Sequence, residues 1–115
     1  MKLLTNSILR RLIANSEKSA PIDGGFDHKP VVKLFDPSGA ATWLLTEIDP
    51  QQHNFAFALE DLGDGRIWLG YVSLKNIEAM RSPLGPSIER DLHFTADKTI
   101  GAYAAAARLA GRIVA

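Results

Sequence analysis

The stretch NFAFALEDLGDGRIWLGYVS, from Asn54 to Ser73, carries the clearest structural signal in the chain. Its first part alternates: Phe55, Phe57 and Leu59 share one face of a strand, and small alanines occupy the other. The Gly-Asp-Gly sequence at 63–65 supplies the positive φ angles of a tight turn. The second part is apolar on both faces, which is typical of a strand covered on both sides. The stretch therefore predicts an antiparallel hairpin with an aromatic core face and an alanine-rich face that admits a closely packed helix.

Two further β-rich runs precede this hairpin. They are PVVKLF at 30–35 and ATWLLTE at 41–47, joined by the turn sequence DPSG and followed by DPQQ. Such short links between strands require antiparallel neighbours. We expect a four-stranded meander over residues 30–73.

Helical patterns flank the meander. LTNSILRRLIAN at 4–15 predicts an amphipathic helix capped by Thr5 or Asn6, and SLKNIEAMR at 73–81 predicts a short helix capped by Ser73. SIERDLHF at 87–94 then reads as a fifth strand, and Thr95 as the cap of a final helix to the C-terminus. The predicted fold class is α+β in a single domain, 1–115: a four- to five-stranded, mainly antiparallel meander with N-terminal, connecting and C-terminal helices.

The last predicted helix is apolar around most of its circumference. Between Ile100 and Ala115 only Arg108 and Arg112 are charged. A helix of this kind needs burial on more than one side. It is expected either to cross the face that carries Ala56 and Ala58, or to meet a second copy in a homodimer.

Composition excludes several classes of protein. The chain has 115 residues, 46% of them hydrophobic and 23% charged, and it contains no cysteine. Disulfides, thiolate nucleophiles and cysteine-based metal sites are therefore excluded. The apolar runs are too short and too interrupted by charge for a membrane span or a signal peptide, so we expect a cytoplasmic protein. The chain has none of the glycine-rich phosphate-binding motifs, and no cofactor is predicted.

Charge is balanced overall but unevenly placed. Thirteen basic and thirteen acidic residues give a net charge of zero, which lacks the basic excess of a dedicated nucleic-acid binder. A basic cluster near the first helix nevertheless leaves nucleic-acid binding open as an alternative, and it consists of Lys2, Arg10, Arg11 and Lys18.

The segment at 88–94 raises the question of catalysis. In a strand, Glu89, Asp91 and His93 would share one face, and two carboxylates with an imidazole can bind a metal or exchange protons. The same pattern is typical of a half-exposed strand whose outer charges discourage edge pairing. Because His28, His53 and His93 are far apart and lack metal-binding spacing, no metal site is predicted.

Arg90 requires a separate explanation. In the predicted strand it shares a face with apolar side chains, and a charge removed from water must be paired. Glu47 and Glu78 are the candidate partners of a structural ion pair, and presentation of Arg90 to a ligand or protein partner is the alternative.

Several of these segments resemble one bacterial family. VKLFDPSGAATWLLTEIDP at 32–50 and LGYVSLKNIEAMRSPLGPSIERDLHF at 69–94 are similar to the proteins grouped as "domain of unknown function 2958", which occur on plasmids and other mobile elements. The resemblance implies a small intracellular accessory protein and brings no activity with it. His93 stands where an aromatic is expected in that family.

Three hypotheses follow. The preferred one is a non-enzymatic module that contacts an unidentified protein partner on behalf of a plasmid or mobile element. The first alternative is a nucleic-acid-binding accessory that uses the basic helix. The second is an enzyme that uses Glu89, Arg90, Asp91 and His93, which is less expected than a non-enzymatic role.

Overall fold

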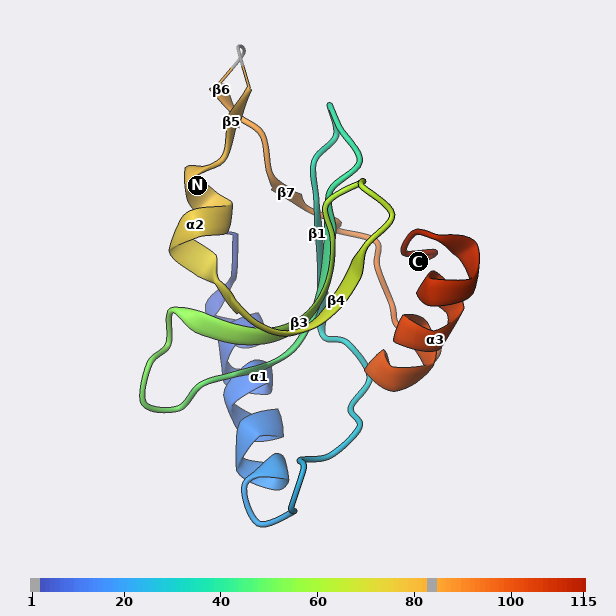
Figure 1. The fold of residues 1–115 in the computed structure, drawn as a ribbon. Coiled ribbons are helices and arrows are strands. Elements are labelled where there is room, and N and C mark those ends of the chain that lie inside the picture. Colours follow the sequence, from blue (N-terminus) through green and yellow to red (C-terminus); the bar gives the residue numbers. More distant parts are fainter. Residues whose placement is uncertain (1–2, 83–84) are drawn as a thin grey trace.

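A computed structural model describes residues 3–82 and 85–115. Its centre is a five-stranded antiparallel sheet of order β4-β3-β2-β1-β7, so the predicted α+β fold is confirmed (Figure 1). The strands of this sheet are β1 (Val32–Phe35), β2 (Thr42–Ile48), β3 (Phe55–Asp61), β4 (Ile67–Ser73) and β7 (Glu89–Arg90). The helices are α1 (Asn6–Ser19), α2 (Leu74–Ala79) and α3 (Ile100–Ala110). A small hairpin is formed by β5 (Arg81–Ser82) and β6 (Gly85–Pro86).

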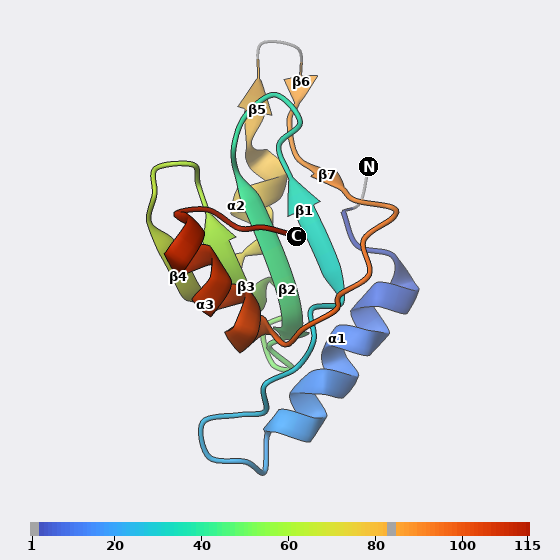
Figure 2. The same cartoon turned by 90° about the vertical axis from the view of Figure 1, so that its right-hand side faces the viewer.

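Helices cover both faces of the sheet. α1 and α2 lie on one side and α3 lies on the other (Figures 1 and 2). The first side holds the larger apolar cluster, which includes Leu12, Trp43 and Ile77. The second side holds Leu44 and Leu59 beneath α3. No helix in the described residues is long and apolar enough to cross a membrane.

The C-terminal helix does not lie where the alanines of the third strand were predicted to receive it. Ala56 and Ala58 belong to the cluster on the α1 side, and α3 covers the opposite face around Leu59. The physical reason is that large side chains, Leu12 and Trp43 among them, already fill the space beside the alanines. The prediction of a C-terminal helix is confirmed, but the helix covers the face of the sheet opposite the predicted one.

Helix caps decide the ends of the helices. Thr5 and Ser73 accept hydrogen bonds from Ile8 N and Asn76 N, as predicted. The cap of α3 is Thr99 instead of the predicted Thr95. α3 also ends earlier than predicted, at Ala110, because Gly111 takes a left-handed conformation with φ 77°.

The chain after α3 folds back onto the sheet. Figure 2 shows this tail crossing toward β1. Ile113 is buried, and its N–H donates to Asp61 Oδ2 at 3.0 Å. Lys33 Nζ donates to the carbonyl of Ala115 at 2.9 Å. The tail therefore closes the α3 layer.

The predicted fifth strand is much shorter in the structure. β7 covers only Glu89–Arg90 and pairs with β1, with Leu34 opposite Arg90. Asp91 Oδ1 accepts the N–H of His93 at 2.9 Å, which turns the chain away from the sheet. Leu92 is consequently 75% exposed and does not share a buried face with Arg90.

Candidate functional site

Arg90 donates to a backbone carbonyl, whereas the predictions were an ion pair with Glu47 or Glu78 or presentation to a ligand or partner. Its Nη1 donates to the carbonyl of Leu3 at 2.6 Å, which ties the chain before α1 to β7. Across the described residues, neither Glu47 nor Glu78 forms an ion pair with it. Glu47 instead accepts a hydrogen bond from Ser19, and Glu78 is exposed on α2.

The polar residues around β7 do not converge. Glu89 and His93 are exposed, and Asp91 lies 3.7 Å from the ammonium of Lys33. None of them lines the cavities described below. Within residues 3–82 and 85–115 no group of three metal-ligating side chains is found.

The basic cluster lies along α1. Arg10, Arg11 and Lys18 are exposed on this helix, and Lys2 lies outside the described residues. Arg11 and Lys18 are seven positions apart and share one side of the helix, whereas Arg10 is turned about 100° away from Arg11. The basic groups therefore point in different directions around α1.

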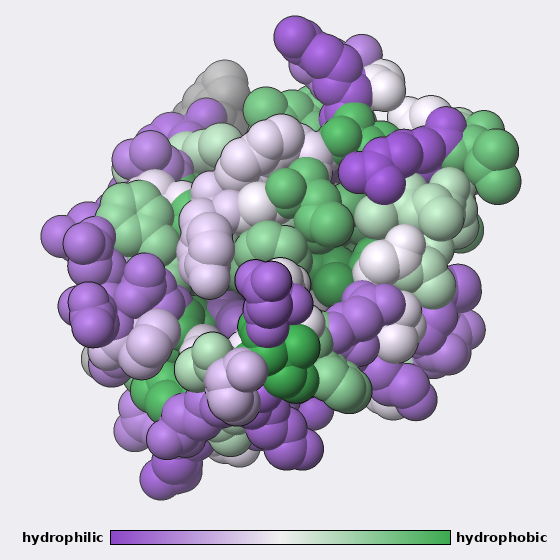
Figure 3. Space-filling model, turned by 60° about the horizontal axis from the view of Figure 1, so that its bottom comes forward, coloured by the Kyte–Doolittle hydropathy of each residue, from purple (hydrophilic) through white to green (hydrophobic). Residues whose placement is uncertain are grey.

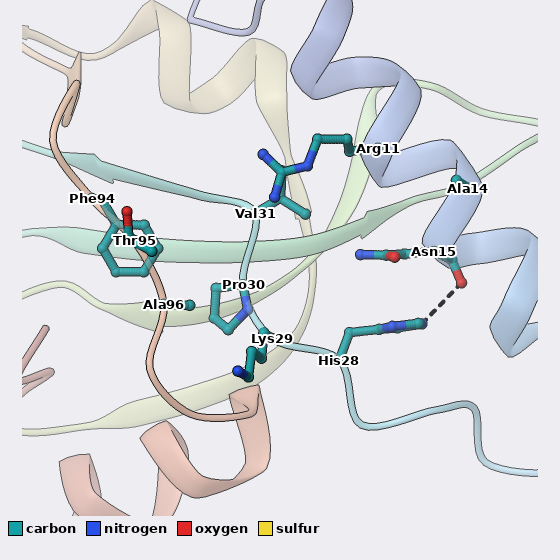
Figure 4. A pocket seen from close by; sticks show the side chains of 10 residues that line it. All are labelled: Arg11, Ala14, Asn15, His28, Lys29, Pro30, Val31, Phe94, Thr95 and Ala96. Carbon is teal, nitrogen blue, oxygen red and sulfur yellow. Dashed lines mark hydrogen bonds between the residues drawn. The ribbon is translucent and has the colours of Figure 1, made fainter.

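Arg11 borders a cavity of about 440 Å³ between α1, the segment at 28–31 and the segment at 94–96 (Figure 4). Its walls include Asn15, His28 and Phe94. In Figure 4 the ring of His28 points toward α1, where its Nε2 is hydrogen-bonded to the carbonyl of Asn15 at 3.0 Å. The polar contact of His28 is thus made at the margin of the cavity, with the helix backbone.

A buried polar cluster joins α1 to the sheet, and sequence reasoning missed it. The three side chains are Ser19 at the end of α1, His28 in the following loop, and Glu47 on β2, and all three are buried. Ser19 Oγ donates to Glu47 Oε2 at 2.6 Å and lies 3.1 Å from His28 Nε2. The same oxygen accepts the N–H of Phe26 at 3.1 Å. This cluster fixes the loop between α1 and β1.

The hydrogen-bond partners of His28 argue against a serine–histidine nucleophile in this arrangement. A carbonyl only accepts, so His28 Nε2 must carry a proton to bond the Asn15 carbonyl. That nitrogen is therefore a donor toward Ser19 as well and cannot act as its base. The Ser19 hydroxyl proton goes to Glu47, whose carboxylate only accepts. In this arrangement the cluster has a structural role, through its hydrogen bonds and the charge of Glu47.

A β-bulge aims Glu47. The register of β2 against β3 shifts between Leu45 and Glu47. Glu47 therefore pairs with Phe57, whereas an unshifted register would pair it with Ala56. One extra residue in a strand moves the following side chains to the opposite face. Phe57 in turn pairs with Tyr71 on β4, so Glu47, Phe57 and Tyr71 form one row across three strands. Thr46 Oγ1, at the bulge, is buried without a hydrogen-bond partner in the described part of the chain.

This row faces a second cavity, of about 380 Å³. The cavity lies between the end of α1, the loop after it, and the three strands, and the rings of Phe26, Phe57 and Tyr71 line it together with Glu47. The rings of Phe57 and Tyr71 meet edge to face with centroids 5.5 Å apart. Figure 3 brings the lower end of Figure 1 forward, where hydrophobic and hydrophilic surface are interspersed. We call this feature the aromatic cavity.

The electrostatic field at the aromatic cavity is negative. Burial raises the pKa of the Tyr71 hydroxyl above its ordinary value, and the negative charges of Glu47 and Asp49 raise it further. Both carboxylates therefore contribute negative potential at Tyr71, which lines the cavity.

The outer strand β4 presents two partly exposed aromatic side chains. It is the last strand in the sheet order, so one edge of its backbone has no strand partner within residues 3–82 and 85–115. Trp68 is 48% exposed and Tyr71 is 52% exposed on this strand. The indole of Trp68 lies over Gly70, where an added Cβ would be 2.6 Å from the ring.

Two hollows flank the indole. They measure about 490 and 450 Å³, and Glu60, Leu62 and Trp68 line both. The indole of Trp43 fixes Glu60, because Trp43 Nε1 donates a hydrogen bond to Glu60 Oε1 at 2.8 Å. We call the exposed strand and its two tryptophan-bordered hollows the β4 edge.

These features define a small α+β domain with an open sheet edge and a negative aromatic cavity. A family model described as "Protein of unknown function (DUF2958)" matches residues 3–114, nearly the whole chain, so the protein belongs to this family. No curated protein and no solved structure matches the chain.

Proposed function

We propose that the protein is a non-enzymatic interaction module that binds a partner protein through the β4 edge. The observation that carries this proposal is the seven-residue edge strand, whose outer side has no strand partner in the described residues and which bears two half-exposed aromatic side chains. An unpaired strand offers a row of backbone donors and acceptors to another chain, and side chains on the same strand supply specificity. Exposed tryptophan and tyrosine are also the side chains that dominate the energy of protein interfaces.

The family resemblance supports a proposal for the wider role. We propose an intracellular accessory protein of a plasmid or other mobile element. Glu89 and His93 are exposed, and none of the polar side chains at 89–93 lines the described cavities, which favours a binding role over catalysis at that segment.

Quantitative co-purification from the native host tests this function. Tagged wild type is compared with Trp68→Lys, which places a charge on the β4 edge, and with Leu109→Lys on α3, where Leu109 is 92% exposed. We expect a partner retained by wild type and by Leu109→Lys and depleted with Trp68→Lys. Equal retention by all three chains would contradict the proposal.

Nuclease treatment separates the nucleic-acid alternative. A partner held by direct protein contact stays bound after DNase and RNase digestion. Loss of every partner on digestion, together with low-salt binding of nucleic acid that falls with Arg10→Ala, would favour binding through the basic residues of α1 instead. Self-association through α3 is a separate proposal: light scattering of wild type and Leu109→Lys is expected to show a dimer that the variant weakens.

A further inference from the structure

The aromatic cavity combines one acid with several rings and no base. Among the described side chains that line it, Glu47 is the one charged group, and none of them is a lysine or arginine. The other polar groups are the hydroxyls of Ser16, Ser19 and Tyr71. Ser16 Oγ is already bonded to the carbonyl of Ile48, and Ser19 is bonded to Glu47. The cavity therefore offers a carboxylate as its one ionic group.

Glu47 is only partly satisfied by the protein. The residue is 9% exposed, and its Oε2 takes the Ser19 proton at 2.6 Å and lies 3.8 Å from His28 Nε2. Its Oε1 accepts no hydrogen bond from the described residues and is not sealed from solvent. A carboxylate largely removed from water is stabilised by a nearby cation. One oxygen is thus positioned by the fold, and the other remains available to a ligand.

The aromatic walls suit the same kind of ligand. A cation is attracted to the face of an aromatic ring, and enclosure by several rings with an acid is how proteins recognise alkylammonium groups. Phe26 reaches the cavity from the loop, and Phe57 and Tyr71 reach it from the sheet. The contact of Phe26 with His28, at 4.8 Å between ring centroids, and the edge-to-face contact of Phe57 with Tyr71 hold the rings in place.

We propose that the aromatic cavity binds an alkylammonium ion, with Glu47 neutralising its charge and Phe26, Phe57 and Tyr71 enclosing its alkyl groups. The volume of about 380 Å³ lies in the range of small-molecule sites. Anions are disfavoured by the negative field of Glu47 and Asp49. Neutral ligands of the same shape lose the ionic contribution.

The source of the ammonium group is either a free metabolite or a lysine side chain of a partner. The second source connects the cavity to the proposed function, because Tyr71 belongs both to the cavity and to β4. The cavity proposal itself stands without a partner protein, since a small cation is a sufficient probe.

Choline and its neutral isostere 3,3-dimethylbutan-1-ol are the matched probes. Each is titrated into ¹⁵N-labelled wild-type protein while the backbone amide shifts are followed by NMR. We expect saturable choline shifts centred on Phe26, Phe57 and Tyr71. The neutral isostere should bind with an affinity at least about tenfold lower than that of choline. An acetylated trimethyllysine amide and acetylated lysine amide form the second arm. Tighter binding of either than of choline assigns the site to a partner's lysine, and tighter binding of choline assigns it to a free cation.

Variants locate the binding energy. Glu47→Gln and Tyr71→Ala are each expected to weaken choline binding by about tenfold, and Trp68→Ala, on the opposite face of β4, is expected to leave it unchanged. Thermal melts identify a variant that fails to fold. If Glu47→Gln fails to fold, Tyr71→Ala still tests the proposal, because Tyr71 is half-exposed. Equal binding of choline and the isostere, the absence of binding of any cation, or full binding by Tyr71→Ala would overturn the proposal. These results would leave co-purification through the β4 edge unaffected.

Discussion

Removal of the Ser19 hydroxyl should destabilise the protein substantially, although it deletes a single oxygen atom. In Ser19→Ala, Glu47 loses a 2.6 Å hydrogen bond inside a site where all three polar partners are buried. A hydrogen bond to a charged group contributes about 1.5–3 kcal/mol. His28 keeps its bond to the Asn15 carbonyl, and the Phe26 N–H is partly accessible to water, so these groups add little.

The expected loss in the free energy of unfolding is therefore about 2–3 kcal/mol, or roughly 10 °C in melting temperature for a domain of this size. Urea unfolding and thermal melts monitored by circular dichroism measure both quantities. Ser38→Ala is the matched control, because Ser38 is exposed in the 36–39 turn and should change stability by less than about 0.5 kcal/mol. If Ser19→Ala is as stable as Ser38→Ala, the account of the buried cluster is refuted.

Three further predictions concern the α3 layer and pH. Leu59→Ala should cost about 2–5 kcal/mol in urea unfolding, because Leu59 is fully buried beneath α3, whereas Leu109→Ala should cost less than about 0.5 kcal/mol; equal losses would contradict this packing. Gly111→Ala should cost about 1 kcal/mol, since its φ of 77° is unfavourable for a Cβ although the space around it is open; an unchanged melt would contradict this cap. Burial and the Asp97 carboxylate raise the pKa of Tyr103 above its unfolded value near 10. The folded state therefore binds the Tyr103 proton more tightly than the unfolded state does. The stabilisation from protonated Tyr103 is complete below the unfolded pKa and is lost as pH rises through the folded pKa. Between pH 9 and 11 the free energy of urea unfolding should fall less steeply for Tyr103→Phe than for wild type, and an equal fall would argue against this assignment.

The sheet and helix order could be predicted because their signals are local. Alternation at 54–60, the glycines at 63–65 and the hydroxyl caps Thr5 and Ser73 each act within a few residues. The same local reasoning placed the cap of α3 at Thr95, because Thr95 and Thr99 are equivalent as caps in the sequence. The hydrogen bonds of Ile100 N to the His28 carbonyl and Gly101 N to Asp27 Oδ1, from a distant loop, accompany the later start.

The candidate sites depended on contacts that the sequence does not encode locally. Ser19, His28 and Glu47 follow no recognisable spacing, and the bulge that turns Glu47 toward Phe57 leaves no distinctive residue in the strand. Arg90 was predicted to pair with Glu47 or Glu78 or to be presented to a ligand, and in the structure its Nη1 donates to the backbone carbonyl of Leu3. An arginine can be satisfied by any nearby acceptor, so composition alone does not identify which one.

Hydrogen–deuterium exchange of the protein with and without its co-purified partner maps the surface that the partner covers. Amides on the outward edge of β4 (Ile67–Ser73) have no strand partner in the described residues and should exchange rapidly in the isolated protein. Binding through the β4 edge predicts strong protection of peptides covering β4, with little change over α1. Protection confined to α1 or α3, with β4 exchanging as before, would contradict the account.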